Sequence, residues 1–125
     1  MYRKNTAENI AFVNDKILNY WESFETFNAK GYGYCLLVDN VVASLAITGW
    51  TAGNVYAISI ETENIYRCKG YAKICASSLL NCYLQKGYVS HWECETDNIA
   101  SAKLAESLGF VKLNNYLVYG FKLND

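Results

Sequence analysis

Hydrophobic and polar residues follow two different periods along this chain, and its first half predicts a helix and a hairpin. Between residues 5 and 21 the apolar positions are spaced as on one side of an amphipathic helix. Two runs rich in β-branched and other apolar residues follow, at 34–38 and 41–47. Only Asp39 and Asn40, two turn-forming residues, separate these runs, so the pattern predicts a tight β-hairpin.

The second half of the chain alternates strand-like and helix-like segments. A strand, a helix and a second strand in succession, as expected over residues 55–94, form a right-handed parallel crossover. The fold class that follows is α/β (an α+β mixed sheet) with helices on both faces of the sheet. In order, we expect a loop at 49–53, a strand at 54–60, a helix at 71–86, a strand at 89–94, a helix between Asp97/Asn98 and Gly109, and a hairpin of strands at 110–113 and 116–123.

Length and charge narrow the class of protein. With 125 residues there is room for one hydrophobic core, so we expect a single domain over 1–125, with an N-terminal helical segment at 1–30 and a core at 33–123. The net charge of -1 argues against nonspecific nucleic-acid binding, which needs a basic field. There is no apolar run of transmembrane length and no signal-peptide segment, so we expect no membrane contact and a cytoplasmic location.

The five cysteines predict neither a disulfide framework nor a metal site. Their number is odd, and no two of them have Cys-x-x-Cys spacing. Cys75 and Cys82 lie a heptad apart on one side of a predicted helix, where a thiol packs as a small apolar group. We therefore expect no metal.

The segment from Ser59 to Lys73 carries the most specific chemistry in the sequence. A strand ends, a short loop containing Arg67, Lys69 and Gly70 follows, and a helix begins. The first backbone N–H groups of a helix have no intrahelical partner and lie at the positive end of the helix dipole. Together with the basic side chains, they predict a site for a ligand that carries phosphates. The alternative interpretation is an ordinary solvated turn.

The residue spacing in this loop resembles that of one family. Arg67-x-x-Gly70-x-Ala72 is not a P-loop, and it resembles the acyl-CoA pyrophosphate loop of the GNAT superfamily of N-acetyltransferases, Arg/Gln-x-x-Gly-x-Gly/Ala. The segment Asn98–Phe110 resembles the following helix of that superfamily, which opens near an Asn and closes on Gly-Phe. Four short motifs look like the zwittermicin-resistance type of acetyltransferase: Ile60-Glu61-Thr62, Tyr66-Arg67-x-Lys69-Gly70, His91-Trp92-Glu93-Cys94 and Leu108-Gly109-Phe110.

The resemblance implies an acyl-CoA N-acyltransferase fold and a set of residues that bind acetyl-CoA. Backbone groups of Ile60 and Thr62 would bind the pantetheine arm. At the start of the later helix, Asn98 would contact that arm, with Ser101 beside it, and Lys103 would reach a phosphate. The alternative roles of these three residues are helix capping and solvation. The loop residues implied to hold the diphosphate are Arg67, Cys68, Lys69, Gly70, Tyr71, Ala72 and Lys73.

The catalytic groups are less clear, because two positions that the superfamily commonly uses hold other residues. Ala105 stands where a Tyr acid is common, and Tyr56 stands where a Glu is common. Transfer to an amine needs a base that leaves the amine neutral. We rank Glu61 first and Glu93 second, and expect the ends of their strands to be neighbours. Loop solvation is the alternative for Glu61, and His91 is either a proton carrier or a structural residue.

The leading hypothesis is an acetyl-CoA-dependent N-acetyltransferase that transfers an acyl group directly to the amine of a small molecule or peptide. Two alternatives stay open: a CoA-binding module without catalysis, and the C-terminal portion of a larger acetyltransferase. The second follows because the superfamily usually opens with one more strand than we find. Trp50 and Trp92 either line an acceptor pocket or belong to the core. The sequence leaves the acceptor and the oligomeric state open, with a homodimer as one option.

Overall fold

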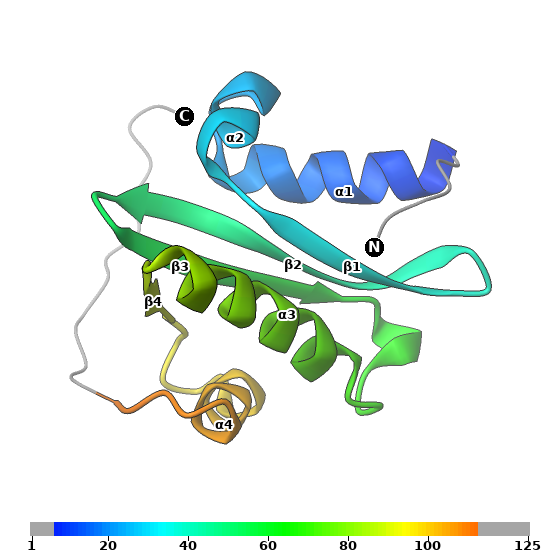
Figure 1. Cartoon of the computed structure of the whole chain (residues 1–125). Helices are drawn as coiled ribbons and strands as arrows, with labels where there is room; N and C mark the ends of the chain where they lie inside the picture. The colour runs from blue at the N-terminus through cyan, green and yellow to red at the C-terminus, as the bar shows by residue number, and fades with distance from the viewer. Residues whose placement is uncertain (1–6, 113–125) are drawn as a thin grey trace, which may run out of the picture. The chain divides into compact units, whose positions relative to one another are not determined.

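Residues 7–112 are described by the computed structural model, and they divide after Glu93 into two units. Within residues 7–93 the first unit contains one sheet and the helices that cover it, whereas the described part of the second unit contains α4 (Ile99–Ser107) (Figure 1). The elements of the first unit are α1 (Ala7–Tyr20), α2 (Phe24–Lys30), β1 (Gly33–Val38), β2 (Val41–Ala52), β3 (Val55–Thr62), the 3-10 helix η1 (Asn64–Tyr66), α3 (Tyr71–Lys86) and β4 (Val89–His91).

The sheet is mixed, as the sequence predicts. Its strand order is β1-β2-β3-β4, with antiparallel pairing from β1 to β3 and parallel pairing between β3 and β4. The chain crosses from β3 to β4 through α3, which spans the residues expected of it and ends at Gly87 with a φ of 75°. The predicted α/β fold class is therefore confirmed, while the single domain expected over 1–125 stays a prediction.

Several predicted boundaries are wrong, each for a local reason. The strand expected at 89–94 ends at His91, because β4 pairs only with the first three residues of β3. The loop expected at 49–53 is mostly strand, since β2 continues to Ala52 past an irregularity. The short α2 was not predicted because it buries no residue and leaves no hydrophobic period. Residues 110–112 are not in a strand, and the rest of the expected final hairpin lies outside the described residues.

Two hydrophobic layers cover the two faces of the sheet, with α1 behind it and α3 in front of it in Figure 1. On the α1 face, Ile17 packs in a cluster with Cys35, Val42, Leu45 and Ile47. On the α3 face, β2 contributes the fully buried Ser44 and Thr48, and β3 contributes Tyr56, whose ring lies against that of Tyr83 on the helix. The fully or nearly fully buried residues of α3 are Cys75, Ala76, Leu79, Cys82 and Tyr83.

Two irregularities in strand pairing decide which residues of β2 face α1. The first lies where Leu36 pairs with Ser44 and Leu37 with Val42, so β2 has an extra residue there, Ala43. Val42 therefore faces α1 together with Leu45, although strict alternation would separate them. The second lies between the pairs Thr48–Ile58 and Thr51–Tyr56, where two residues of β2 oppose one residue of β3.

Tyr83 links α3 to both central strands. Its hydroxyl lies 2.7 Å from Thr48 Oγ1 and donates to the Ala57 carbonyl at 2.9 Å. The side chain is fully buried, and this burial raises the pKa of Tyr83. The hydroxyl is therefore protonated near pH 7, where it can donate to the Ala57 carbonyl.

Replacing Tyr83 by Phe tests this link. Removing the hydroxyl leaves the buried Ala57 carbonyl without its donor, which costs about 1–3 kcal/mol of unfolding free energy. Urea denaturation followed by circular dichroism measures the loss. Tyr66→Phe is the control, because Tyr66 is half-buried on η1, and it should change stability by less than about 0.5 kcal/mol. Equal effects of the two substitutions would contradict the assignment.

Candidate functional site

The loop between β3 and α3 exposes the first amides of a sixteen-residue helix. Gly70 is the N-cap residue of α3, has a φ of 80°, and provides no side chain to cap the helix. The N–H groups of Tyr71, Ala72 and Lys73 therefore have no partner within the helix. A Cβ at Gly70 would meet no atom within 4 Å, so the approach to these amides is open. The uncapped helix start expected from the sequence is therefore present, and its binding of an anion stays a prediction.

The basic side chains around this helix start are exposed to solvent. Lys69 and Lys73 are exposed, and so is Arg67, whose Nε donates to the Thr62 carbonyl at 3.1 Å. That hydrogen bond ties the loop to the end of β3. Cys68 is also exposed and has a φ of 63°, a left-handed conformation that is uncommon outside glycine. The seven loop residues implied to bind diphosphate are therefore brought together around one helix N-terminus.

Beyond Ala57, β3 has no partner strand on its β4 side within the described residues. β4 pairs with Val55–Ala57 only, while β3 continues to Thr62. Backbone groups of successive residues in a strand point to opposite sides. The Glu63 amide donates to the Ala43 carbonyl of β2, and the Val89 amide of β4 donates to the Asn54 carbonyl. The backbone N–H and C=O groups of odd-numbered residues in β3 therefore point toward β2, and those of even-numbered residues point toward the β4 side.

The backbone groups of Ile60 and Thr62 therefore point into the gap beside β3, where the sequence expected a ligand to bind. Their two carbonyl oxygens already have cationic donors. Lys16 Nζ lies 3.1 Å from Ile60 O, and Arg67 Nε lies 3.1 Å from Thr62 O. What this edge offers to a ligand is consequently two N–H groups next to two positive charges.

The two candidate bases, Glu61 and Glu93, lie on the α1 face of the sheet, at different positions along the direction of the strands. The carboxylate of Glu61 is half-exposed, 3.5 Å from Lys16 Nζ. Glu93 is also half-exposed, with its Oε1 3.5 Å from His91 Nε2. His91, the last residue of β4, pairs with Ala57, whereas β3 continues to Thr62. The two strand ends are therefore not level, and the expectation that they are neighbours is wrong.

Tyr56, which stands where the superfamily often has a Glu, is not a base in this structure. It is buried and stacks on Tyr88 with ring centroids 3.8 Å apart. The hydrogen bond with Tyr88, with burial adding to it, raises the pKa of Tyr56 to about 12. The phenol is therefore neutral near pH 7. Ala105, at the other substituted position, is buried in the second unit.

The residues predicted on α4 form a helix start. Asn98 is the N-cap residue, and its side-chain oxygen accepts a hydrogen bond from the Ser101 amide at 3.1 Å. Lys103 is exposed one turn further on. The capping interpretation of Asn98 is thus confirmed. These residues belong to the second unit, and their contact with CoA stays a prediction.

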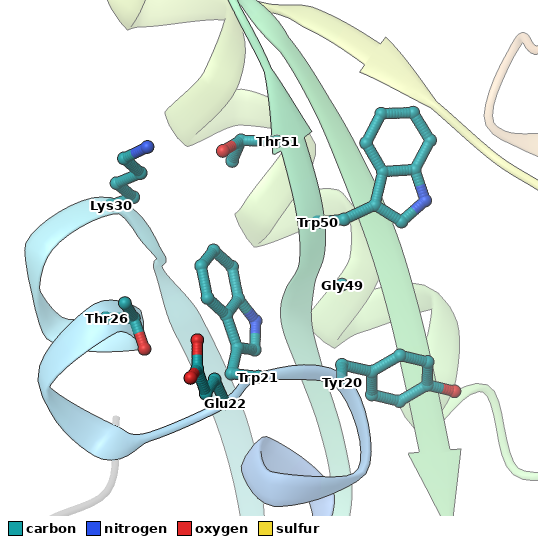
Figure 2. A pocket seen from close by; sticks show the side chains of 8 residues that line it. All are labelled: Tyr20, Trp21, Glu22, Thr26, Lys30, Gly49, Trp50 and Thr51. Carbon is teal, nitrogen blue, oxygen red and sulfur yellow. The ribbon is translucent and has the colours of Figure 1, made fainter.

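A cavity of about 260 Å³ lies where the α1–α2 junction and α2 meet β2 (Figure 2). Tyr20 and Trp50 are exposed and flank Gly49, which has Ser59 and Tyr20 close to the position a Cβ would take. Trp50 also contacts His91, with ring centroids 5.1 Å apart. The residues that line this cavity are Tyr20, Trp21, Glu22, Thr26, Lys30, Gly49, Trp50 and Thr51.

Sequence reasoning named Trp50 as a possible pocket residue but missed the rest of the cavity, and it missed Lys16. The cavity depends on α2 and on the irregularity at Gly49, neither of which leaves a periodic signal. The sequence held one weak indication that Lys16 is buried, because this lysine directly precedes Ile17, a core residue on the apolar side of α1. The other predicted aromatic, Trp92, is half-buried.

Residues 7–112 contain no cluster of three side chains that could ligate a metal ion. None of the helices described there has the length and apolarity needed to cross a bilayer. Cys75 and Cys82 are buried in α3, which confirms the packing role expected for them.

Comparison with known proteins gives the same family from sequence and from structure. The profile of the GNAT acetyltransferase family matches residues 2–119. The N-acetyltransferase YdfB of Bacillus subtilis (strain 168) is 31% identical over 115 residues, which cover 92% of this chain and 42% of YdfB. A GCN5-related N-acetyltransferase-like protein from Streptococcus suis 89/1591 is 31% identical, with a TM-score of 0.69 over 75% of this chain and 37% of that protein.

A more distant structure shares the fold over nearly its whole length. The aminoglycoside N-acetyltransferase AAC(6')-Iy, solved in complex with CoA, is 16% identical, with a TM-score of 0.70 over 93% of this chain and 92% of that protein. By contrast, this chain spans less than half the length of YdfB and of the Streptococcus suis protein. From the family profile and the similarity to YdfB, the chain belongs to the GNAT acetyltransferase family.

Proposed function

We propose that this chain is an N-acetyltransferase that uses acetyl-CoA and transfers the acetyl group directly to the amine of a small molecule or peptide. Within the family, we propose the zwittermicin-resistance type, on the four motifs found in the sequence. The observation that carries the proposal is that two surfaces suited to acetyl-CoA are joined by one short loop. The open edge of β3 leads through residues 63–69 to the uncapped N-terminus of α3.

Acetyl-CoA fits this surface in one direction. Its diphosphate is multiply anionic and matches the amides of Tyr71–Lys73, the helix dipole and the basic side chains of Arg67 and Lys69. Its pantetheine arm carries amide carbonyls, which match the N–H groups of Ile60 and Thr62 along the strand edge. Contact of Asn98, Ser101 and Lys103 with acetyl-CoA is a separate part of the proposal, which rests on the family resemblance alone.

The transfer step then needs only a base and a polarised thioester. Backbone N–H groups of the β3 edge polarise the thioester carbonyl and stabilise the oxyanion that forms when the amine attacks. The carbon–nitrogen bond forms, the carbon–sulfur bond breaks, and one proton passes from the amine to the base. Glu61 is the first candidate because it lies on the open part of β3, and Glu93 is the second.

The acceptor occupies the aromatic cavity in this proposal. The rings of Tyr20 and Trp50 and the carboxylate of Glu22 suit a small organic cation, because aromatic faces and carboxylates both attract an ammonium group. Gly49 keeps the floor between the two rings free of a side chain.

A CoA-binding module without catalysis is the competing function. The buried, neutral Tyr56 at a position often held by Glu favours it. Incubation with acetyl-CoA and a panel of primary amines separates the two functions, since a module binds CoA without releasing thiol above background.

Disrupting the loop should abolish CoA binding while the fold is retained. Arg67→Glu with Gly70→Val reverses one charge and places a β-branched residue at a φ of 80°. We expect the dissociation constant to rise at least about a hundredfold, because each lost charged hydrogen bond costs about 1.5–3 kcal/mol. Isothermal titration calorimetry with CoA measures it.

The matched control for this pair is Lys86→Glu with Gly53→Val. It makes the same changes at an exposed lysine at the end of α3 and at a glycine with a φ of 60° in the β2–β3 turn. CoA affinity should stay within about threefold of the original chain. If the loop variant bound CoA normally while remaining folded, the proposed site would be wrong.

The two candidate bases make different predictions. Glu61→Gln removes the base without changing its size, and we expect kcat to fall by about 10²–10⁴ with little change in CoA affinity. Glu93→Gln should lower kcat less than tenfold. Thiol release from acetyl-CoA, with the amine that the panel shows to react fastest, measures both. The reverse order of effects would assign the base to Glu93.

Trp50→Ala tests the acceptor cavity. Losing one aromatic wall costs about 0.5–1.5 kcal/mol, so KM for the amine should rise by about two- to tenfold. KM for acetyl-CoA should not change, and Trp50→Phe should keep most of the affinity. A rise in KM for acetyl-CoA alone would place Trp50 on the cofactor instead.

A further inference from the structure

Lys16 is a charged residue inside the α1 layer. Only 5% of its surface is exposed, whereas lysines are almost never fully buried unless paired. It lies on α1 directly before Ile17, which packs against the sheet, and one turn before Tyr20. A position this close to the core would ordinarily hold an apolar side chain.

The Lys16 ammonium has three neighbours, and two of them belong to the proposed transfer site. Its Nζ lies 3.1 Å from the Ile60 carbonyl oxygen and 3.5 Å from Glu61 Oε1. It also lies 4.9 Å from the centre of the Tyr20 ring. Lys16 therefore joins the open strand edge, the first candidate base and one wall of the acceptor cavity.

Stability alone does not account for a lysine at this place. Removing an ammonium from water is costly, and replacing a buried charge pair by apolar groups of similar volume is often neutral or stabilising. Glu61 is also half-exposed, so its carboxylate could be solvated without Lys16. The arrangement instead fixes the direction of a side chain that would otherwise rotate in solvent.

We propose that Lys16 is a positioning residue for acetyl transfer, which holds the Glu61 carboxylate beside the open edge of β3. This inference rests on the proposed function, with Glu61 as the base. The amine nitrogen gives its proton to Glu61 as the carbon–nitrogen bond forms. The electron pair of the breaking carbon–sulfur bond leaves on the CoA sulfur, which then takes a proton.

A second consequence concerns the strand edge. Because Lys16 and Arg67 already donate to the carbonyls of Ile60 and Thr62, a ligand on this edge meets donors and positive charge rather than alternating donors and acceptors. This favours carbonyl oxygens of the ligand over its N–H groups.

Lys16→Met tests the proposal, because it removes the charge and keeps the length of the side chain. We expect kcat with acetyl-CoA and the best amine of the panel to fall at least tenfold. CoA affinity by calorimetry should stay within about threefold, and the urea midpoint should be unchanged or higher. Lys16→Arg should restore kcat to within about threefold. The control is Lys86→Met, at an exposed lysine on α3, which should leave kcat unchanged.

A double-mutant cycle with Glu61→Gln separates positioning from a structural role. If Lys16 acts through Glu61, kcat of Lys16→Met with Glu61→Gln should lie within about threefold of Glu61→Gln alone. Multiplied effects of the two substitutions, or an unchanged kcat in Lys16→Met, would overturn the inference. If Lys16→Met does not fold, Lys16→Gln takes its place in the cycle, and loss of folding in both would assign Lys16 to structure alone.

The proposed function fails separately from this inference. An original chain that does not bind CoA, or that binds CoA without transferring acetyl to any amine, rules out the proposed reaction and the role of Lys16 with it. An original chain that binds CoA and acetylates an amine, with a Lys16→Met variant that does the same at equal rate, rules out the role of Lys16 only.

Discussion

The unequal length of two neighbouring strands is the constraint on which the site depends. β4 pairs with three residues of β3, and β3 then continues for five more residues to Thr62. A strand normally satisfies its backbone groups on both sides. Here one side is left to side chains and ligands over the segment that leads into the loop. Were β4 longer, it would close the gap that acetyl-CoA is proposed to fill.

The rest of the first unit keeps this open strand rigid. On its other side β3 pairs with β2, and the buried Tyr83 hydroxyl fixes the Ala57 carbonyl at the point where the pairing with β4 ends. At the far end, Arg67 ties the loop to Thr62 and Lys16 reaches Ile60 from α1. Each anchor comes from a different element, so the position of the strand edge reflects the packing of the whole unit.

Local patterns predicted most of the fold and the position of the loop before α3. The hydrophobic period, the glycine placement and the basic residues of the segment 67–87 indicate this loop and helix, and both appear where expected. Long-range features were not predictable in this way. The early end of β4, the register change at Gly49 and the approach of Lys16 to Glu61 all depend on pairing between distant segments. The choice between Glu61 and Glu93 as the base is equally unpredictable from local patterns, because it depends on where β4 ends relative to β3.

The irregularity of β2 between Thr48 and Thr51 separates the residues proposed to bind the acceptor from those proposed to bind the cofactor. Within the first unit, the proposed cofactor surface is a contiguous stretch from Ile60 to Lys73, whereas the aromatic cavity draws on α1, α2 and the bulged part of β2. Substitutions at Tyr20 or Trp50 change the cavity wall without altering the backbone of the loop. Descendants of one ancestral chain could therefore acquire new amine substrates while inheriting the same donor, with the bulge acting as the boundary between the variable and the inherited part.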